Sequence, residues 1–203
     1  MNIGWIEISI KQYGGNVYNE LARHALAGEH RVELVLCEAK FFRRFRPFKL
    51  LESLVHLVRL RGKKDVWVRD FYSMLTLPLD RTKGKNIVMV HHDDFSGFSQ
   101  PARFFLSVLQ HALFYRNLRR ADAIITVSEY WKRHFLQKGY PRVHTIYNGF
   151  DLSQFQISES EVAAFRKREH LEGKPIVYLG NCQKAKGVES AYKALQGINA
   201  HLV

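Results

Sequence analysis

The sequence predicts an α/β protein: a Rossmann-like parallel sheet with helices on both faces, followed by the first part of a second Rossmann-like domain. Short β-branched runs alternate with longer amphipathic segments along the chain, as in strand-helix-strand units. Glycine or polar residues follow several of these runs, where a doubly wound sheet places its ligand-binding loops. The chain has 203 residues, of which 46% are hydrophobic, enough for one full domain and part of another.

The first predicted unit lies at the N-terminus. Residues Asn2 to Ile8 are expected to form a strand, and a helix is expected from about Asn16 to Ala27. Arg31 to Cys37, with its Val-Glu-Leu-Val-Leu pattern, predicts the second strand. One side of the helix carries apolar or small residues: Val17, Leu21 and Ala25.

Two glycines precede this helix and end the loop that begins at Lys11. Backbone amides at a helix N-terminus point outward with the positive end of the helix dipole. Gly14 and Gly15 would therefore let a phosphate or a polar sugar approach closely. The alternative is that the two glycines only make a tight turn.

The segment from Lys40 to Lys64 is strongly basic, with nine lysines and arginines against one acid, Glu52. Phenylalanines alternate with arginines at its start, and leucines and valines follow at helical spacing. This pattern suits an interfacial amphipathic helix on anionic lipid. An ordinary surface helix packed on the sheet is the alternative. Arginines among aromatics also suit single-stranded nucleic acid, but the segment has no recognisable RNA-binding motif, so no nucleic acid is expected.

Two more strands are predicted, over Asp65 to Arg69 and Asn86 to Val90, and the second is followed directly by His91-His92-Asp93-Asp94. Ligands of a doubly wound sheet bind beyond the carboxyl ends of its strands, so a histidine here is placed to contact substrate. A structural histidine and a metal site are the alternatives. Adjacent side chains at a strand end point to opposite faces, so only about half of the four could reach one ion. We expect no metal site.

From Phe104 to Gly149 the predicted elements alternate between helix and strand. Phe104 to Leu118 predicts a core helix, and Ala123 to Val127 predicts a buried strand. Ser128 then stands where a helix N-cap belongs, and that helix ends at Gly139. Val143 to Tyr147 is the next predicted strand, closed by Asn148 and Gly149.

A second unit is predicted after residue 150, so the expected domains are 1–150 and 151–203. A charged helix is expected from Ser158 to Leu171, with acids in its first turn and arginines later. A strand from Ile176 to Leu179, a loop to Gly187 and a helix from Val188 to Leu195 follow, and Ala200 to Val203 reads as the start of another strand.

Four stretches carry a family resemblance. ADAIITVSEYWKRHF followed by VHTIYNGFDLSQF resembles the signature of the nucleotide-sugar glycosyltransferases of family 4, which have the two-domain GT-B fold. YGGNVYNELARHAL and YLGNCQKAKGVESAYKAL resemble the family more loosely. The resemblance implies that residues 1–150 are the N-terminal, acceptor-side domain. Residues 151–203 would be the linker and the start of the nucleotide-sugar-binding domain.

The resemblance also implies roles for individual residues. Gly14 and Gly15 would lie against the donor phosphate, and His91 would face the reacting sugar as the catalytic candidate. Lys186 matches a lysine that meets the donor diphosphate, and Asn181 stands where the family usually has an arginine. The acceptor-side candidates are His92, which is also the second choice for the catalytic position, Asn148, Arg43 and Arg44.

The implied reaction is transfer of a sugar from a nucleotide-sugar donor to a glycan or lipid-linked acceptor, as in glycan or glycolipid biosynthesis. It would retain the anomeric configuration and need no metal and no cofactor besides the nucleotide sugar as co-substrate. The family's second domain holds two glutamates separated by seven residues, and the 203 residues contain no counterpart, so no turnover by this chain alone is expected. A non-catalytic nucleotide-sugar-binding or partner subunit, and a basic RNA-binding protein, are the alternatives.

Charge and cysteine content suggest where the protein acts. The formal net charge of +12 implies anionic partners. Cys37 and Cys182 are too few and too far apart for a disulfide framework, which favours a reducing compartment. No apolar run reaches the roughly 20 residues needed to cross a bilayer. The expected location is cytoplasmic, at most peripheral at the inner face of the membrane.

Overall fold

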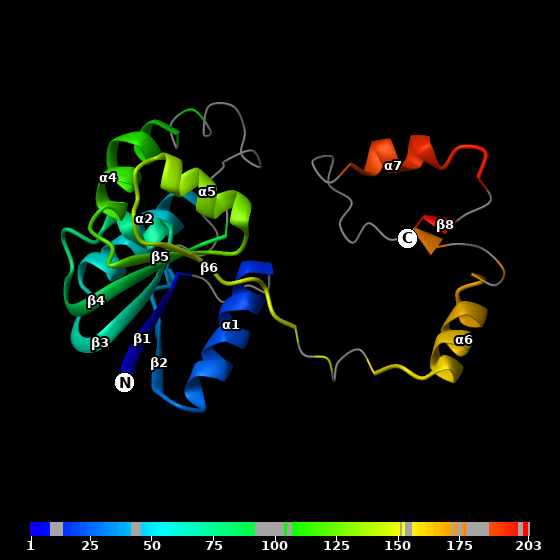
Figure 1. Cartoon of the computed structure of the whole chain (residues 1–203), viewed down its shortest axis with the longest axis horizontal. Coiled ribbons are helices and arrows are strands. Elements are labelled where there is room, and N and C mark those ends of the chain that lie inside the picture. The colour runs from blue at the N-terminus through cyan, green and yellow to red at the C-terminus, as the bar shows by residue number, and fades with distance from the viewer. Residues whose placement is uncertain are drawn as a thin grey trace. The chain divides into compact units, whose positions relative to one another are not determined.

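The structure is a computed structural model that describes residues 1–8, 14–41, 46–91, 104, 107–150, 152, 156–171, 173, 176–177, 187–198 and 201–202. The chain divides into two compact units, Met1–Phe150 and Asp151–Val203. Figure 1 shows the elements of both.

The first unit is built on a six-stranded sheet in the order β2-β1-β3-β4-β5-β6 (Figure 1). Its strands are β1 (Asn2–Glu7), β2 (Arg31–Leu36), β3 (Arg61–Asp70), β4 (Arg81–Val90), β5 (Ala123–Thr126) and β6 (Val143–Thr145). Every neighbouring pair is parallel, so the carboxyl ends of all six strands lie at one edge. The predicted Rossmann-like parallel sheet is confirmed.

Helices cover both faces of this sheet. They are α1 (Gly14–Ala27), α2 (Arg46–Val58), the 3₁₀ helix η1 (Tyr72–Leu75), the π-helical segment η2 (Gln110–Phe114), α4 (Tyr115–Leu118) and α5 (Glu129–Gln137). β4 shows the two faces, since Met89 packs in the core under α1 while Val88 and Val90 pack in the core under α4 and α5. The α2 helix lies on the face opposite α1, where Leu57 packs with Ile6 and Trp67.

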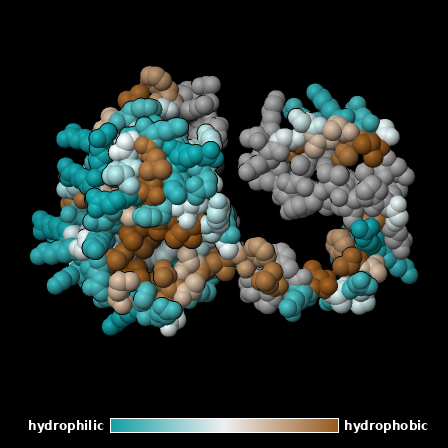
Figure 2. Space-filling view, viewed as in Figure 1, coloured by the Kyte–Doolittle hydropathy of each residue, from teal (hydrophilic) through white to brown (hydrophobic). Residues whose placement is uncertain are grey.

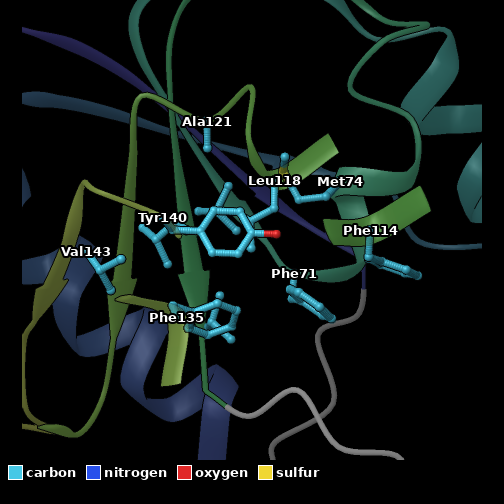
Figure 3. Close-up of a cluster of buried hydrophobic side chains, with 11 residues drawn as sticks. Phe71, Met74, Phe114, Leu118, Ala121, Phe135, Tyr140 and Val143 are labelled. Atoms are coloured by element: carbon cyan, nitrogen blue, oxygen red, sulfur yellow. The ribbon is translucent and has the colours of Figure 1, made fainter. Parts of the chain in front are cut away.

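Aromatic side chains fill the core beneath α4 and α5 (Figure 3). The rings of Phe71 and Phe114 are stacked with centroids 4.9 Å apart. Phe135 of α5 is fully buried, and its ring meets that of Tyr140 edge-on at 5.8 Å. The Tyr140 hydroxyl donates to the Tyr115 carbonyl over 2.7 Å, which satisfies the one polar atom of this ring.

The buried side of α1 differs from the predicted one. Val17 is 47% exposed and Ala25 is exposed, whereas Tyr18, Ala22 and Leu26 pack on the sheet. Both rows follow helical spacing, and they are one residue apart. Tyr18 buries more surface than Val17 can, which favours the row that contains the ring.

β3 and β4 are also longer than predicted, and they divide the basic segment. α2 ends at Val58, and Arg61, Lys63 and Lys64 belong to β3. These charged residues join the sheet because β3 pairs with β4 from Arg61 onward. Gly84 permits the pairing, since a Cβ there would meet the Lys64 carbonyl oxygen and its φ is +130°. The basic segment over residues 40–64 is therefore not one element: α2 covers Arg46–Val58, and the last cations of the segment belong to the sheet.

The second unit contains α6 (Glu159–Arg168), β7 (Ile176–Val177), α7 (Val188–Ala194) and β8 (His201–Leu202), and β7 pairs with β8 in parallel. The α6 helix is confirmed. The Ser158 side chain accepts from the Glu161 amide, and the Glu161 carboxylate accepts from the Ser158 amide over 2.8 Å, so the two form a capping box. Exposed apolar side chains lie on the stretch that leads to α6: Ile146, Phe150, Leu152 and Ile157. Figure 2 shows hydrophobic atoms along this part of the chain.

Candidate active site

The carboxyl edge of the sheet brings together the start of α1 and the end of β4. His91 directly follows β4 and is half-buried. Its Nε2 lies 3.3 Å from Oδ1 of Asn19 on α1, and its ring meets the Tyr18 ring edge-on with centroids 5.2 Å apart. Asn19 follows Gly15 by four residues, a rise of about 6 Å along the helix. The glycines and His91 therefore lie at the same edge.

The two glycines were predicted to end a loop ahead of the helix, but the structure places them inside it. Gly14 and Gly15 are the first two residues of α1, which starts before the expected Asn16. Their amides belong to the first four of the helix, which have no acceptor inside it. The dipole of a helix of 14 residues favours an anion at this end.

Tyr18 links α1 to the end of the unit. Its hydroxyl donates to the Ile146 carbonyl over 3.3 Å, and burial raises the pKa of Tyr18, which keeps the hydroxyl protonated. Asn148 lies just beyond Ile146 and is exposed. β6 ends at Thr145 rather than at the predicted Tyr147, so Asn148 belongs to a stretch without regular structure.

The other predicted site residues lie outside the described part of the chain: His92, Arg43, Arg44, Asn181 and Lys186. Among the residues that are described, no group of three or more histidines, cysteines, aspartates or glutamates could hold a metal ion. No helix in the described ranges is long and apolar enough to span a bilayer.

Sequence analysis missed a polar row on α1. Asn19 and Arg23 are one turn apart and face the sheet among apolar residues. Arg23 Nε lies 3.7 Å from the Glu7 carboxylate at the end of β1, and burial raises the pKa of Glu7. The sequence contained one indication of this row: Asn19 and Arg23 are four residues apart, so they lie on the same side of a helix, next to Tyr18.

Asp70, at the end of β3, makes the stability of the chain depend on pH. It accepts from the Ser73 amide over 2.7 Å, yet burial raises the pKa of Asp70 to about 6. An unfolded aspartate titrates near pH 3.9. Between about pH 4 and pH 6 the folded chain thus holds a proton that the unfolded chain has lost, and the free energy of unfolding falls as pH rises.

Asp70→Asn is expected to remove this part of the pH dependence. The amide keeps an acceptor for Ser73 and carries no charge to desolvate, so the variant should gain on the order of 1–3 kcal/mol over wild type at pH 7.5. The gain should disappear near pH 4. Urea unfolding at the two pH values measures it, and a variant that loses stability equally at both would contradict the assignment.

The profile of Glycosyltransferase Family 4 matches residues 14–154, more than half of the chain. The chain belongs to this family. The match covers α1 and the four strands from β2 to β5, together with β6 and His91. No curated protein matches the chain.

Solved structures of one cyanobacterial protein share the fold. The Anabaena protein Alr3699/HepE in complex with UDP-glucose matches with a TM-score of 0.61 at 16% identity, covering 100% of this chain and 59% of HepE. The complexes with UDP and glucose, and with UDP, match with TM-scores of 0.60 and 0.59 at 17% identity. The family 4 chain therefore has the fold of HepE and spans a little under three fifths of its length.

Proposed function

We propose that the chain forms the acceptor-side domain, and the start of the donor-side domain, of a hexosyltransferase-like GT-B enzyme. The enzyme would transfer a sugar from a nucleotide-sugar donor to a glycan or lipid-linked acceptor. One observation carries this proposal: His91, which contacts Asn19 of α1, and the glycine-led N-terminus of that helix lie at the same carboxyl edge of the sheet. Ligands of doubly wound sheets bind at that edge.

The donor is inferred from chemistry at this edge and from the relative. HepE binds UDP-glucose, which supports a uridine diphosphate sugar as the first candidate. The amides of Gly14 and Gly15 suit a diphosphate oxygen. Lys186 and Asn181, which follow β7 in the sequence, would meet the diphosphate from residues 151–203, the proposed donor-side domain.

The proposed reaction follows the family and retains the anomeric configuration. The bond from the anomeric carbon to the diphosphate oxygen breaks, and a bond from that carbon to the acceptor oxygen forms on the same face of the sugar. The acceptor proton goes to a departing phosphate oxygen. His91 would hold a sugar hydroxyl and orient the ring, while the helix N-terminus would stabilise the charge of the leaving diphosphate.

A transfer assay with UDP-glucose and a panel of glycan and lipid-linked acceptors tests the function. Release of UDP that depends on the acceptor would support it, and the deciding variant is His91→Ala. The proposal would be contradicted if no protein that contains these residues, including one with a complete donor-side domain, transferred a sugar from any nucleotide sugar.

The outward side of α2 supports an anionic membrane as the acceptor's location. Ser53 and Leu57 are buried and face the sheet. The opposite side carries an exposed apolar stripe: Phe48, Leu51, Val55 and Val58, which are 37–58% exposed. Glu52, the one acid of the segment, accepts from the Lys40 and Phe41 amides. The one acid of the segment is thus engaged with backbone amides, and the sequence from Lys40 to Lys64 carries nine lysines and arginines. An exposed apolar stripe within a strongly basic segment fits an anionic lipid surface better than another protein surface.

Placing charges on the stripe should release the protein from membranes. Leu51→Asp with Val55→Asp is expected to lower binding to vesicles of 30% phosphatidylglycerol more than tenfold, because burying these two exposed side chains in lipid would contribute about 3 kcal/mol. Flotation measures this, and Val162→Asp with Phe165→Asp on α6 is the matched control. Unchanged flotation would overturn the membrane proposal. So would a wild-type protein that binds no vesicles and forms a dimer through this stripe, which the same substitutions would break.

A further inference from the structure

The strands β3 and β4 begin with cations that the proposed site does not use. Two cationic pairs stand in register across these strands: Arg61 with Arg81, and Lys63 with Lys83. Lys85 follows on β4. All five side chains are exposed, and together they form a surface that we call the cation ladder: Arg61, Lys63, Arg81, Lys83 and Lys85.

The cation ladder lies on the face of the sheet that α1 covers. On β4, Met89 packs in the core under α1, whereas Val88 packs under α4 and α5. This alternation continues to the start of the strand, since Thr82 and Asn86 both contact Arg69. The odd-numbered cations of β4 therefore share the face of Met89, and the cations of β3 beside them point the same way.

Like charges side by side on neighbouring strands repel each other and weaken the pairing. In the described part of the chain, none of the five cations forms an ion pair. The acids around them have other partners: Glu33 pairs with Lys64, Asp80 pairs with Arg69, and Asp65 and Asp122 accept from backbone amides. An anionic ligand would remove the repulsion, so a polyanion fits this surface.

The surroundings of the cation ladder select among polyanions. β3 and β4 are described throughout, and their one aromatic residue, Trp67, is buried with Leu57 on the other face. The ladder thus offers no ring on which a nucleic-acid base could stack. The exposed stripe of α2 is also on that other face, so a protein that docks on lipid through α2 turns the ladder away from the lipid.

We propose that the cation ladder binds an anionic part of the acceptor, which is then an acidic polysaccharide with carboxylate or sulfate groups. The identity of this ligand as the acceptor rests on the proposed function. Along the strand, Lys85 precedes His91 by six positions and Arg81 precedes it by ten, a rise of about 20–33 Å. The ladder therefore holds the polysaccharide far from its reacting end, and the acceptor must be several sugars long.

Binding to polygalacturonate and to dextran sulfate tests the proposal without donor or transfer, and neutral dextran is the reference glycan. We expect the chain to bind at least one of the acidic glycans and not dextran. Lys63→Gln with Lys83→Gln should weaken this binding about tenfold or more at low salt, since two charged contacts are lost. Lys167→Gln with Lys193→Gln, at exposed positions of α6 and α7, makes the same change in net charge and should have little effect.

Three results of this experiment would overturn the proposal. The first is that neither acidic glycan binds, and the second is that both pairs of substitutions weaken binding equally, which would be an effect of net charge only. The third is that single-stranded RNA or phosphatidylglycerol vesicles bind more tightly than the glycans and lose that binding in Lys63→Gln with Lys83→Gln.

Urea unfolding gives a second readout. Lys83→Gln removes a like charge beside Lys63, so its urea midpoint at low salt should lie above that of wild type, and high salt should abolish the difference. The bound acidic glycan should raise the midpoint of wild type more than that of the doubly substituted ladder. An unchanged or lower midpoint of Lys83→Gln would show that the repulsion is absent, and the proposal would fail.

Transfer assays separate this inference from the proposed function. An enzyme with a complete donor-side domain that transfers no sugar, while the ladder binds acidic glycans, would contradict the proposed function and leave the ladder as a glycan-binding surface. Where transfer occurs, Lys63→Gln with Lys83→Gln should raise the KM for an acidic acceptor and leave the KM for the donor unchanged. An unchanged acceptor KM would overturn the assignment of the ladder to the acceptor.

Discussion

His91→Ala is expected to lower turnover about a hundredfold or more while changing donor affinity less than about threefold, in a protein that joins these residues to a complete donor-side domain. A contact that strengthens in the transition state contributes to turnover more than to ground-state binding, and removing one such contact commonly costs 10²–10³ in rate. Most of the donor's binding would come from its nucleotide and diphosphate, which His91 does not meet in the proposed arrangement. Steady-state kinetics with varied donor, together with titration of UDP, measure the two effects separately.

The matched control for this experiment is His24→Ala. His24 lies on α1 like Asn19 but is exposed, so its removal should leave both constants unchanged. Equal losses of turnover and donor affinity in His91→Ala would indicate a structural role for the ring. Unfolding by urea should show that both variants remain folded, since His91 is only half-buried.

Asp80→Asn is expected to destabilise the first unit by about 3–5 kcal/mol, because it leaves a buried arginine without its counter-ion. Arg69 of β3 is 0% exposed, and its Nη2 lies 2.8 Å from Asp80 Oδ2, where the Asp80 side chain is 2% exposed. Arg69 also donates to the side chains of Asn86 and Thr82, over 2.6 Å and 2.8 Å. These neutral partners cannot replace the charge.

Urea unfolding measures this loss. The matched control is Glu33→Gln, which removes the partner of Lys64 in an exposed ion pair and should change stability far less. Replacing Arg69 and Asp80 together, by methionine and asparagine, should restore part of the loss, since no buried charge is then left alone. A small effect of Asp80→Asn alone would show that solvent reaches Arg69.

Much of the fold could be predicted from local sequence because the signals are local. Ser128 was expected to cap a helix, and its side chain accepts from the Trp131 amide over 3.4 Å. Gly139 was expected to end that helix, and its φ of +83° is one that glycine adopts without strain. Both depend on residues within a few positions of each other, so spacing was enough.

The buried ion pair could not be predicted in this way. Arg69 was expected at the end of a short strand, and nothing near it in sequence showed that the acid just before β4, Asp80, would pair with it. Asp80 and Asn86 reach Arg69 only because β3 and β4 pair from Arg61 onward. The charged residues at the start of β3 and β4 have no apolar pattern that would predict a strand, so their pairing is seen only in the structure.

The position of His91 and the glycines in the sheet could be predicted, but the residues that contact His91 could not. His91 and the glycines were placed at one edge because parallel strands end together, a consequence of topology that alternation of strands and helices already implies. Asn19 was not found, because its role depends on which side of α1 meets the sheet, and two apolar rows were one residue apart.

By itself the sequence determined the alternation of strands and helices in the first unit, and with it that His91 and the glycines lie at one edge of a parallel sheet, since these follow from residue periodicity and chain connectivity. Only the tertiary structure decided which row of α1 is buried, which acid meets Arg69 and which nitrogen of His91 faces Asn19. The physical reason is that those contacts join residues separated in the chain, by 72 positions for Asn19 and His91, and their energies exist only once the sheet has brought the residues together.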